Sequence, residues 1–273
     1  MSIHPDTHMG AVSLTVADLA RSVAFYQQVI GLQLRQQTAH SADFGLLRLT
    51  ENKTARPVSQ TTGLFHFALL VPTRRDLALV FRHLVQAGVD LGASDHLVSE
   101  ALYLDDPDGN GIEIYADQPR EAWSFVGGEL QMATKRLNVP SLLSELETTA
   151  VWSGLPSGTK MGHVHLRVAD IPQAKQFYGQ VLGFDHMMDY GAQASFFSAG
   201  GYHHHLGLNS WQSLNAPPPP PNATGLDYFT IVTPNTAVVR QALEAAEVSI
   251  RPATNGFFIH DPFHNQIFIT EVI

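Results

Sequence analysis

A long internal repeat constrains the fold of this chain more than any other feature. Residues 9–32 read MGAVSLTVADLARSVAFYQQVIGL, and residues 161–184 read MGHVHLRVADIPQAKQFYGQVLGF. Without a gap, the two segments agree at 12 of 24 positions. Self-similarity of this extent indicates that one supersecondary unit is used more than once.

Each copy of the repeat predicts a strand followed by a helix. In the first copy Val12, Leu14 and Val16 alternate with other residues, as is typical of a half-buried strand. Asp18 then suits the N-cap of a helix, and Gly31 suits its end. The second copy has Asp170 and Gly183 at the same places.

Two further segments repeat, so the chain divides into four similar units. GLFHFALLV at 63–71 is echoed at 225–233, and DPDGNGIEI at 106–114 is echoed at 261–269, with helices predicted near 75–87 and 236–246. The units lie near 9–58, 62–117, 161–210 and 224–272, and each reads as a strand, a helix and three short strands. We therefore expect an α+β fold with two chain halves, 1–117 and 161–273. Between them, 118–160 forms a connector with a short helix near 140–147, and the prolines at 217–221 form an extended loop.

Composition excludes several classes of function. The net charge of −9 argues against nucleic acid as a partner, and no stretch approaches the roughly 18 apolar residues of a membrane span. The chain has no cysteine, which excludes disulfides and thiolate metal sites. Without a signal-peptide pattern at residues 1–10, a cytoplasmic location is the expectation. The 14 histidines point to metal binding or proton transfer.

The repeated motifs also carry a family resemblance. With HVHLRVAD at 163–170 and DPDGNGIEI at 106–114, the chain resembles the vicinal oxygen chelate superfamily. Its four-unit layout is similar to that of the two-domain extradiol ring-cleaving dioxygenases, the catechol 2,3-dioxygenases in particular. The resemblance implies four βαβββ modules that form two cup-shaped mixed sheets. It also implies a small aromatic substrate and O₂ as partners, and it is compatible with a homo-oligomer.

The resemblance assigns metal ligands to the first and last strands of the units. The first-strand positions are Ala11, His66, His163 and Tyr228, and the last-strand glutamate positions are Glu113, Gly207 and Phe268. Only three of these residues can bind a metal, namely His66, Glu113 and His163. Two histidines and one carboxylate match the facial triad of non-haem Fe(II) oxygenases, and Mn(II) is also compatible. They meet only if the second unit pairs with the third, which leaves a one–four cup without ligands.

Each proposed ligand also has an ordinary structural explanation. A single histidine such as His66 among apolar residues is more often a core residue, and a single Glu113 is more often a surface carboxylate. Strand alternation nevertheless directs all three candidate ligands away from the helix-packing face. A carboxylate in the apolar run IEIY would cost several kcal/mol if it were buried unpaired. Together, the three positions favour a metal site.

The triplet 203–205 contains a further candidate for catalysis. The resemblance puts His204 at the position of the acid–base histidine, which would take a proton from the catechol and deliver it to an oxygen atom that comes from O₂. Simple alternation disagrees, because with Leu206 and Leu208 facing the helix, His203 and His205 would face the cup instead. A surface metal-binding tract is a third reading of the triplet.

Three other residues are candidates for the pocket. The resemblance implies a tyrosine ten residues before the glutamate, where Tyr103 stands, that forms a hydrogen bond with a substrate oxygen. A packing role for Tyr103 is an equal alternative. We also expect His96 and His165 in the substrate pocket.

The leading hypothesis is an extradiol dioxygenase that uses Fe(II) to cleave a catecholic ring. A glyoxalase-type isomerase or lyase of the same superfamily is an alternative, although such enzymes commonly place more carboxylates around the ion. A non-catalytic protein that binds small molecules is a third hypothesis. It would be favoured if His163 lay far from His66 and Glu113.

Overall fold

The computed structural model describes residues 1–127 and 129–271. Residue 272, at which the predicted fourth unit ends, lies outside them. The first unit contains β1 (His8–Val16), α1 (Leu19–Phe25), the π-helical η1 (Tyr26–Ile30), β2 (Gln36–Gln37), β3 (Ser41–Asp43) and β4 (Leu47–Glu51). The second contains β5 (Gly63–Leu70), α2 (Arg74–Gln86), β6 (Gly92–Asp95), β7 (Ser99–Asp105) and β8 (Gly111–Asp117).

The second half of the chain repeats this order. The third unit contains β12 (Lys160–Arg167), α4 (Ile171–Lys175), the π-helical η3 (Gln176–Val181), β13 (Asp185–Tyr190), β14 (Ala194–Ser198) and β15 (Leu206–Asn209). The fourth contains β16 (Gly225–Val232), α5 (Thr236–Ala245), β17 (Arg251–Ala253), β18 (Gly256–His260) and β19 (Gln266–Thr270). The predicted order of one strand, one helix and three strands is therefore present in all four units.

The units pair across the two halves of the chain. One sheet has the order β17-β18-β19-β16-β1-β4-β3-β2, so it joins the fourth unit to the first. The other has the order β11-β6-β7-β8-β5-β12-β15-β14-β13, so it joins the second unit to the third. β5 and β12 form the antiparallel seam of the second sheet. The pairing of the second unit with the third, on which the predicted metal site depends, is thus found.

Capping residues set the helix boundaries as the repeat predicts. The carboxylate of Asp18 accepts a hydrogen bond from the Arg21 amide at 3.0 Å, and Asp170 accepts one from the Gln173 amide at 2.7 Å. The helical turns end near Gly31 and Gly183, whose φ values are +84° and +81°. A side chain is strained at such angles, so glycine is favoured there.

The repeated aspartates tie neighbouring units together. Asp106 Oδ1 accepts hydrogen bonds from the amides of Asp108 and Asn110, which forms the tight turn before β8. Its other oxygen accepts the buried hydroxyl of Tyr26 at 2.8 Å. Tyr178 makes the same 2.8 Å contact with Asp261 in the second half. Asp106 and Asp261 therefore each connect two units and position the strand that follows, β8 or β19.

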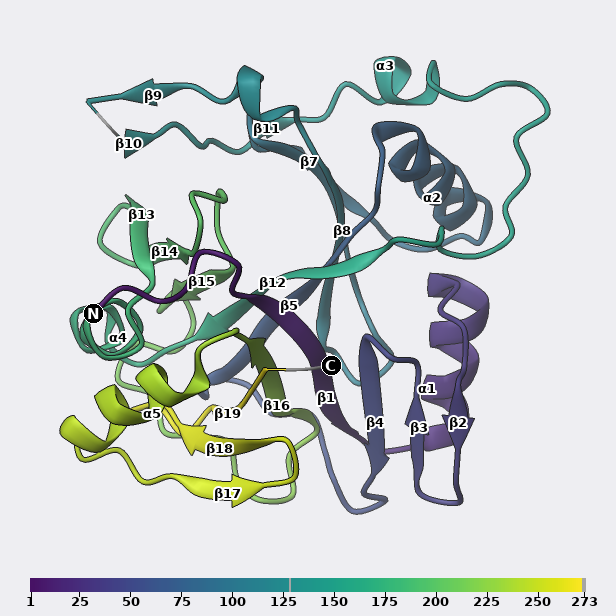
Figure 1. Ribbon diagram of the computed structural model, residues 1–273. Helices are drawn as coiled ribbons and strands as arrows, with labels where there is room; N and C mark the ends of the chain where they lie inside the picture. The colour runs from purple at the N-terminus through teal and green to yellow at the C-terminus, as the bar shows by residue number, and fades with distance from the viewer. Residues whose placement is uncertain (128, 272–273) are drawn as a thin grey trace.

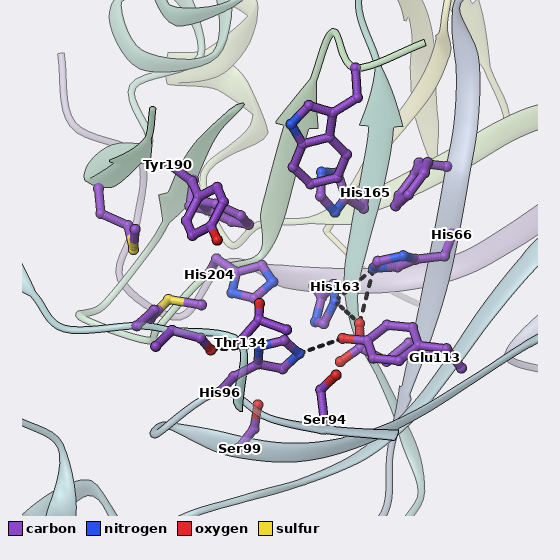
Figure 2. A pocket seen from close by; sticks show the side chains of 17 residues that line it. His66, Ser94, His96, Ser99, Glu113, Thr134, His163, His165, Tyr190 and His204 are labelled. Carbon is purple, nitrogen blue, oxygen red and sulfur yellow. Dashed lines mark hydrogen bonds and ion pairs between the residues drawn. The ribbon is translucent and has the colours of Figure 1, made fainter. Parts of the chain in front are cut away.

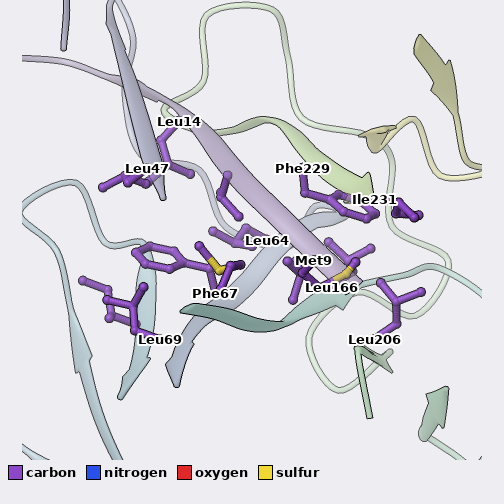
Figure 3. Packing of buried hydrophobic residues seen from close by; sticks show 14 of the residues in the cluster. Met9, Leu14, Leu47, Leu64, Phe67, Leu69, Leu166, Leu206, Phe229 and Ile231 are labelled. Atoms are coloured by element: carbon purple, nitrogen blue, oxygen red, sulfur yellow. The ribbon is translucent and has the colours of Figure 1, made fainter. Parts of the chain in front are cut away.

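One hydrophobic core lies between the two sheets. Figure 3 shows its centre, where β1 contributes Leu14, β5 contributes Phe67, β12 contributes Leu166 and β16 contributes Phe229. All four side chains are buried, and the first strands of the four units cross the middle of the molecule in Figure 1. Each sheet also lines a cavity of its own.

The connector is structured and joins the nine-stranded sheet. It contains η2 (Arg120–Ala122), β9 (Phe125–Val126), β10 (Glu129–Leu130), β11 (Lys135–Arg136) and α3 (Val139–Leu143). β11 pairs with β6 at the sheet edge, and α3 is close to the predicted short helix. The prolines at 217–221 lie outside helices and strands. Among the described residues, no helix is long and apolar enough to cross a membrane.

Candidate metal centre and pocket

Three neighbouring strands bring the predicted metal ligands together. His66 lies on β5, Glu113 on β8 and His163 on β12. In the sheet ladder Ala68 is the partner of both Glu113 and His163, so these two side chains flank β5 on one face. All three predicted ligands are buried, with 7%, 3% and 1% of their surfaces exposed in the order His66, Glu113, His163.

The donor atoms of this triad converge on one point. Oε2 of Glu113 lies 3.0 Å from Nε2 of His66 and 3.0 Å from Nε2 of His163, and the two nitrogens are 3.3 Å apart. An ion at about 2.1 Å from three donors at right angles would separate them by about 3.0 Å, against about 3.4 Å for a tetrahedron. The residues therefore fit a divalent metal ion held on one face, and this triad could bind such an ion.

The protonation states also suit a cation. Burial alone would raise the pKa of the Glu113 carboxyl, but the charges and hydrogen bonds of His163 and His66 outweigh it and hold that pKa well below its usual range. Burial lowers the pKa of His163 to about 4, although Glu113 partly opposes the shift. The site therefore offers a carboxylate and a neutral imidazole at neutral pH, the forms that bind metals.

The second nitrogen of His163, Nδ1, makes no hydrogen bond with any described residue. Nδ1 is buried and unpaired among the described residues. The ring is instead packed against His204, at 4.1 Å between ring centroids, and against Tyr115, at 5.0 Å. Ring packing therefore orients this imidazole together with the contact between its Nε2 and Glu113.

The triad lines a cavity of about 240 Å³ (Figure 2). Its walls are mainly aromatic and apolar, with side chains from both units and from the connector. They include Phe65, Met132, Met188, Tyr190, Phe196 and Trp211. The predicted residues His96, Tyr103, His165 and His204 also line it. A small planar molecule can therefore reach the triad between ring faces.

Tyr103 is held in position by His96. Its hydroxyl lies 2.7 Å from Nε2 of His96, whose Nδ1 lies 2.9 Å from the carbonyl oxygen of Ala133 in the connector. Tyr103 is also the ladder partner of Glu113. Burial, and then the nearby charge of Glu113, raise the pKa of Tyr103 well above 10, so its hydroxyl stays protonated.

Of the histidine triplet, only His204 reaches the cavity. His203 and His205 were expected there from strand alternation, but neither lines it. The reason is that β15 begins at Leu206, so the triplet lies in the loop before the strand and does not alternate. His205 turns inward, where its Nδ1 accepts the Ala199 amide at 3.2 Å. Burial, and then the charge of His203, lower its pKa to about 3.

A hydrogen-bond chain leads from a carboxylate to His204. Nε2 of His203 lies 2.9 Å from Oδ1 of Asp117, and Nδ1 of His203 lies 2.7 Å from Nδ1 of His204. A carboxylate only accepts, so neutral His203 carries its proton on Nε2 and accepts at Nδ1. His204 must then donate from Nδ1. We assign its unprotonated nitrogen to Nε2 from this network.

His165 explains the glycine at the third unit's glutamate position. The His165 ring is buried, and it packs against His66 with 4.9 Å between ring centroids. A Cβ atom added at Gly207 would come within 2.9 Å of this ring. A carboxylate at position 207 is therefore sterically incompatible with His165, so the single carboxylate of the site comes from the second unit.

Within residues 1–127 and 129–271, the cup of the first and fourth units holds no such group of ligands. Its corresponding positions are Ala11, Tyr228 and Phe268, which line a separate cavity with Arg48. Among the described residues, the donor atoms that could hold a metal are clustered at Nε2 of His66, Oε2 of Glu113 and Nε2 of His163.

The aromatic and methionine walls of the cavity were not predicted. Phe65 stands beside the ligand His66 in the sequence, and Trp211 follows β15 closely. Their closeness in sequence to His66 and to the histidine triplet could have predicted that Phe65 and Trp211 line the cavity. Met132 lies in the connector, for which no site role was predicted.

The comparisons with known proteins agree with this architecture. The family model "Glyoxalase/Bleomycin resistance protein/Dioxygenase superfamily" matches residues 8–114 and 160–269. The chain belongs to this superfamily. It is 46% identical over 285 residues to a protein of Bacillus subtilis (strain 168) named catechol-2,3-dioxygenase, with 100% of this chain and 99% of that protein covered.

Two solved structures share the fold of this chain. Glyoxalase I from Zea mays matches with a TM-score of 0.59 at 17% identity, covering 97% of this chain and 92% of that one. The cppA protein from Streptococcus pneumoniae TIGR4 matches with a TM-score of 0.61 at 13% identity, covering 100% of both chains. At these identities the likeness concerns the fold alone.

Proposed function

We propose that this protein is a non-haem Fe(II)-dependent extradiol dioxygenase that cleaves a catecholic ring with O₂. The observation that carries the proposal is the convergence of His66, Glu113 and His163 at the base of an aromatic cavity. The 46% identical relative named catechol-2,3-dioxygenase supports the same chemistry. Mn(II) could replace Fe(II) in this donor set.

His66, His163 and Glu113 would hold the metal. When bound, iron(II) supplies coordination sites at which the catechol oxygens and O₂ can bind together. The protein contributes one negative charge through Glu113, and it leaves the cavity side of the triad free of further carboxylates. This single carboxylate favours the dioxygenase over the isomerase alternative.

Two side chains would manage the protons of the substrate. His204 lines the cavity next to His163, and its unprotonated nitrogen can accept a proton from a catechol hydroxyl. Nδ1 of His96 donates to the Ala133 carbonyl oxygen, so Nε2 of His96 accepts the Tyr103 hydroxyl. The Tyr103 oxygen is left to accept a hydrogen bond from a catechol hydroxyl. The apolar walls exclude water from the reacting groups.

A cytoplasmic location of the protein stays a prediction.

Loading with iron tests the proposal. The protein is loaded with Fe(II) without O₂, freed of excess metal, and then given air and a panel of catechols. We expect O₂ consumption and a yellow ring-fission product. Iron that binds without O₂ uptake from any catechol would contradict the dioxygenase and favour the isomerase.

A matched pair of variants links activity to the triad. Glu113→Gln should lose bound iron and activity, because it removes the only carboxylate of the donor set. Glu121→Gln changes the same chemical group at an exposed position of the connector and should retain both. Iron retained by Glu113→Gln would contradict the assigned ligands.

A further inference from the structure

The cavity above the triad contains no cationic side chain. Among the described residues that line it, none is lysine or arginine, and Glu113 is its one carboxylate. The nearest basic residues in sequence lie elsewhere. Arg167 on β12 lines a separate cavity, and Lys135, next to the lining residue Thr134, is exposed. A negatively charged substituent would therefore find no lysine or arginine partner among the described lining residues.

The walls away from the triad are suited to an apolar group. Tyr190 lies on the far side of His204 from Glu113 in Figure 2. Met188, on the same strand as Tyr190, and Met132 of the connector also line the cavity, as does Phe196 of β14. Methionine and aromatic side chains accept apolar groups of varied shape and offer little to an ionised one.

The volume of the cavity exceeds that of an unsubstituted ring. A benzene-sized molecule fills an apolar cavity of about 150 Å³. The present cavity is about 240 Å³, so a catechol bound at the triad would leave space on the side of Met188 and Tyr190. That space can take a substituent, and the methionine and aromatic side chains around it favour an apolar one.

We propose that the substrate is an uncharged catechol that carries an apolar substituent, and that the cavity rejects catechols with a carboxylated side chain. This inference rests on the proposed function, which supplies the catechol part of the substrate with its two hydroxyl groups. The substituent would pack among Met132, Met188, Tyr190 and Phe196. A carboxylate at that place would lie against methionine and aromatic side chains, lose part of its hydration and have no cationic side chain to pair with, which is costly.

Three catechols of matched shape test this proposal. 3,4-Dihydroxyphenylacetate, its amide and 4-isobutylcatechol carry side chains with the same number and branching of heavy atoms. We expect kcat/KM to be highest for the isobutyl compound and at least about 100-fold lower for the carboxylate. The amide, which is polar but uncharged, should fall between them. Equal values for the carboxylate and the isobutyl compound would overturn the inference.

Binding without turnover separates this inference from the proposed function. Titration calorimetry of the Fe(II)-loaded protein under anaerobic conditions gives an affinity for each compound. If no catechol consumes O₂ but the isobutyl compound still binds about 100-fold more tightly than the carboxylate, the proposed function fails and the selectivity stands. If O₂ is consumed and the carboxylate binds as tightly, the selectivity fails alone.

A cation placed in the wall should change the preference. In Met188→Arg a guanidinium can pair with the carboxylated side chain, so we expect the ratio between the two extreme compounds to fall at least tenfold. Met188→Gln has similar length without the charge, and it should not improve the carboxylate relative to the amide. Leu214→Arg adds the same charge at a position that is 62% exposed and outside the cavity, and it should leave the ratio unchanged. A ratio that is the same in Met188→Arg and Leu214→Arg would contradict the assigned position of the substituent.

Discussion

Replacing His205 with glutamine should flatten the pH dependence of stability. His205 is buried, its Nδ1 accepts the Ala199 amide, and burial lowers its pKa to about 3. In the unfolded chain a histidine has a pKa of about 6.5. As the pH falls below about 6.5, the unfolded state takes up a proton that the folded state does not. Stability is therefore lost between about pH 6.5 and about pH 3.

The size of the effect follows from these two pKa values. A pH of 5 lies about 1.5 units below the pKa of the imidazole in the unfolded chain, so the unfolded imidazole is protonated. The imidazole in the folded protein is still neutral at that pH. At about 1.4 kcal/mol per unit, His205 alone removes about 2 kcal/mol of unfolding free energy between pH 7.5 and pH 5. Other buried groups add their own contributions in both proteins, so the difference between wild type and variant isolates this one.

Urea unfolding with a chelator present measures this difference. Unfolding free energies at pH 7.5 and pH 5.0 are compared for the wild type, His205→Gln and Ser198→Ala. Ser198 contacts His205 at 3.1 Å, so its variant disturbs the same place but keeps the imidazole and should keep the wild-type loss. The same loss in His205→Gln as in the wild type would refute the description of His205 as a buried neutral group.

Three further substitutions test other parts of the site. His204→Phe should bind iron as the wild type does but consume O₂ at least about 100-fold more slowly, and unchanged turnover would exclude a proton-transfer role. Asp117→Asn should lower kcat about 10- to 100-fold with little change in catechol affinity, because an amide can donate to His203 and reverse the tautomer of His204. Gly162→Ala should lower the free energy of unfolding by about 1–3 kcal/mol in thermal or urea unfolding, since the added Cβ would clash with the Tyr115 hydroxyl. Wild-type stability of that variant would show that Tyr115 can move aside.

Much of the fold could be predicted because its signals are local and repeated. The alternation of Val12, Leu14 and Val16, the capping by Asp18 and the turn at Gly31 each depend on a few neighbouring residues. The pairing of the second unit with the third could be predicted indirectly. It followed from the family positions of the ligands, since only that pairing brings His66 and His163 together.

The parts that could not be predicted depend on where strands begin and on distant chain segments. The prediction that His203 and His205 line the pocket was wrong. Period-two alternation applies only inside a strand, and β15 starts at Leu206. The cavity wall draws Met132 from the connector and Tyr190 from the edge strand β13. No spacing in the sequence relates these residues to Glu113, because tertiary packing alone brings them together.

Anomalous diffraction from iron-loaded crystals tests the central claim most directly. Data collected on both sides of the iron absorption edge locate the metal independently of any activity. We predict one strong peak within bonding distance of Nε2 of His66, Nε2 of His163 and Oε2 of Glu113. A peak at the 203–205 triplet, or in the cup formed by the first and fourth units, would contradict a metal centre shared by the second and third units.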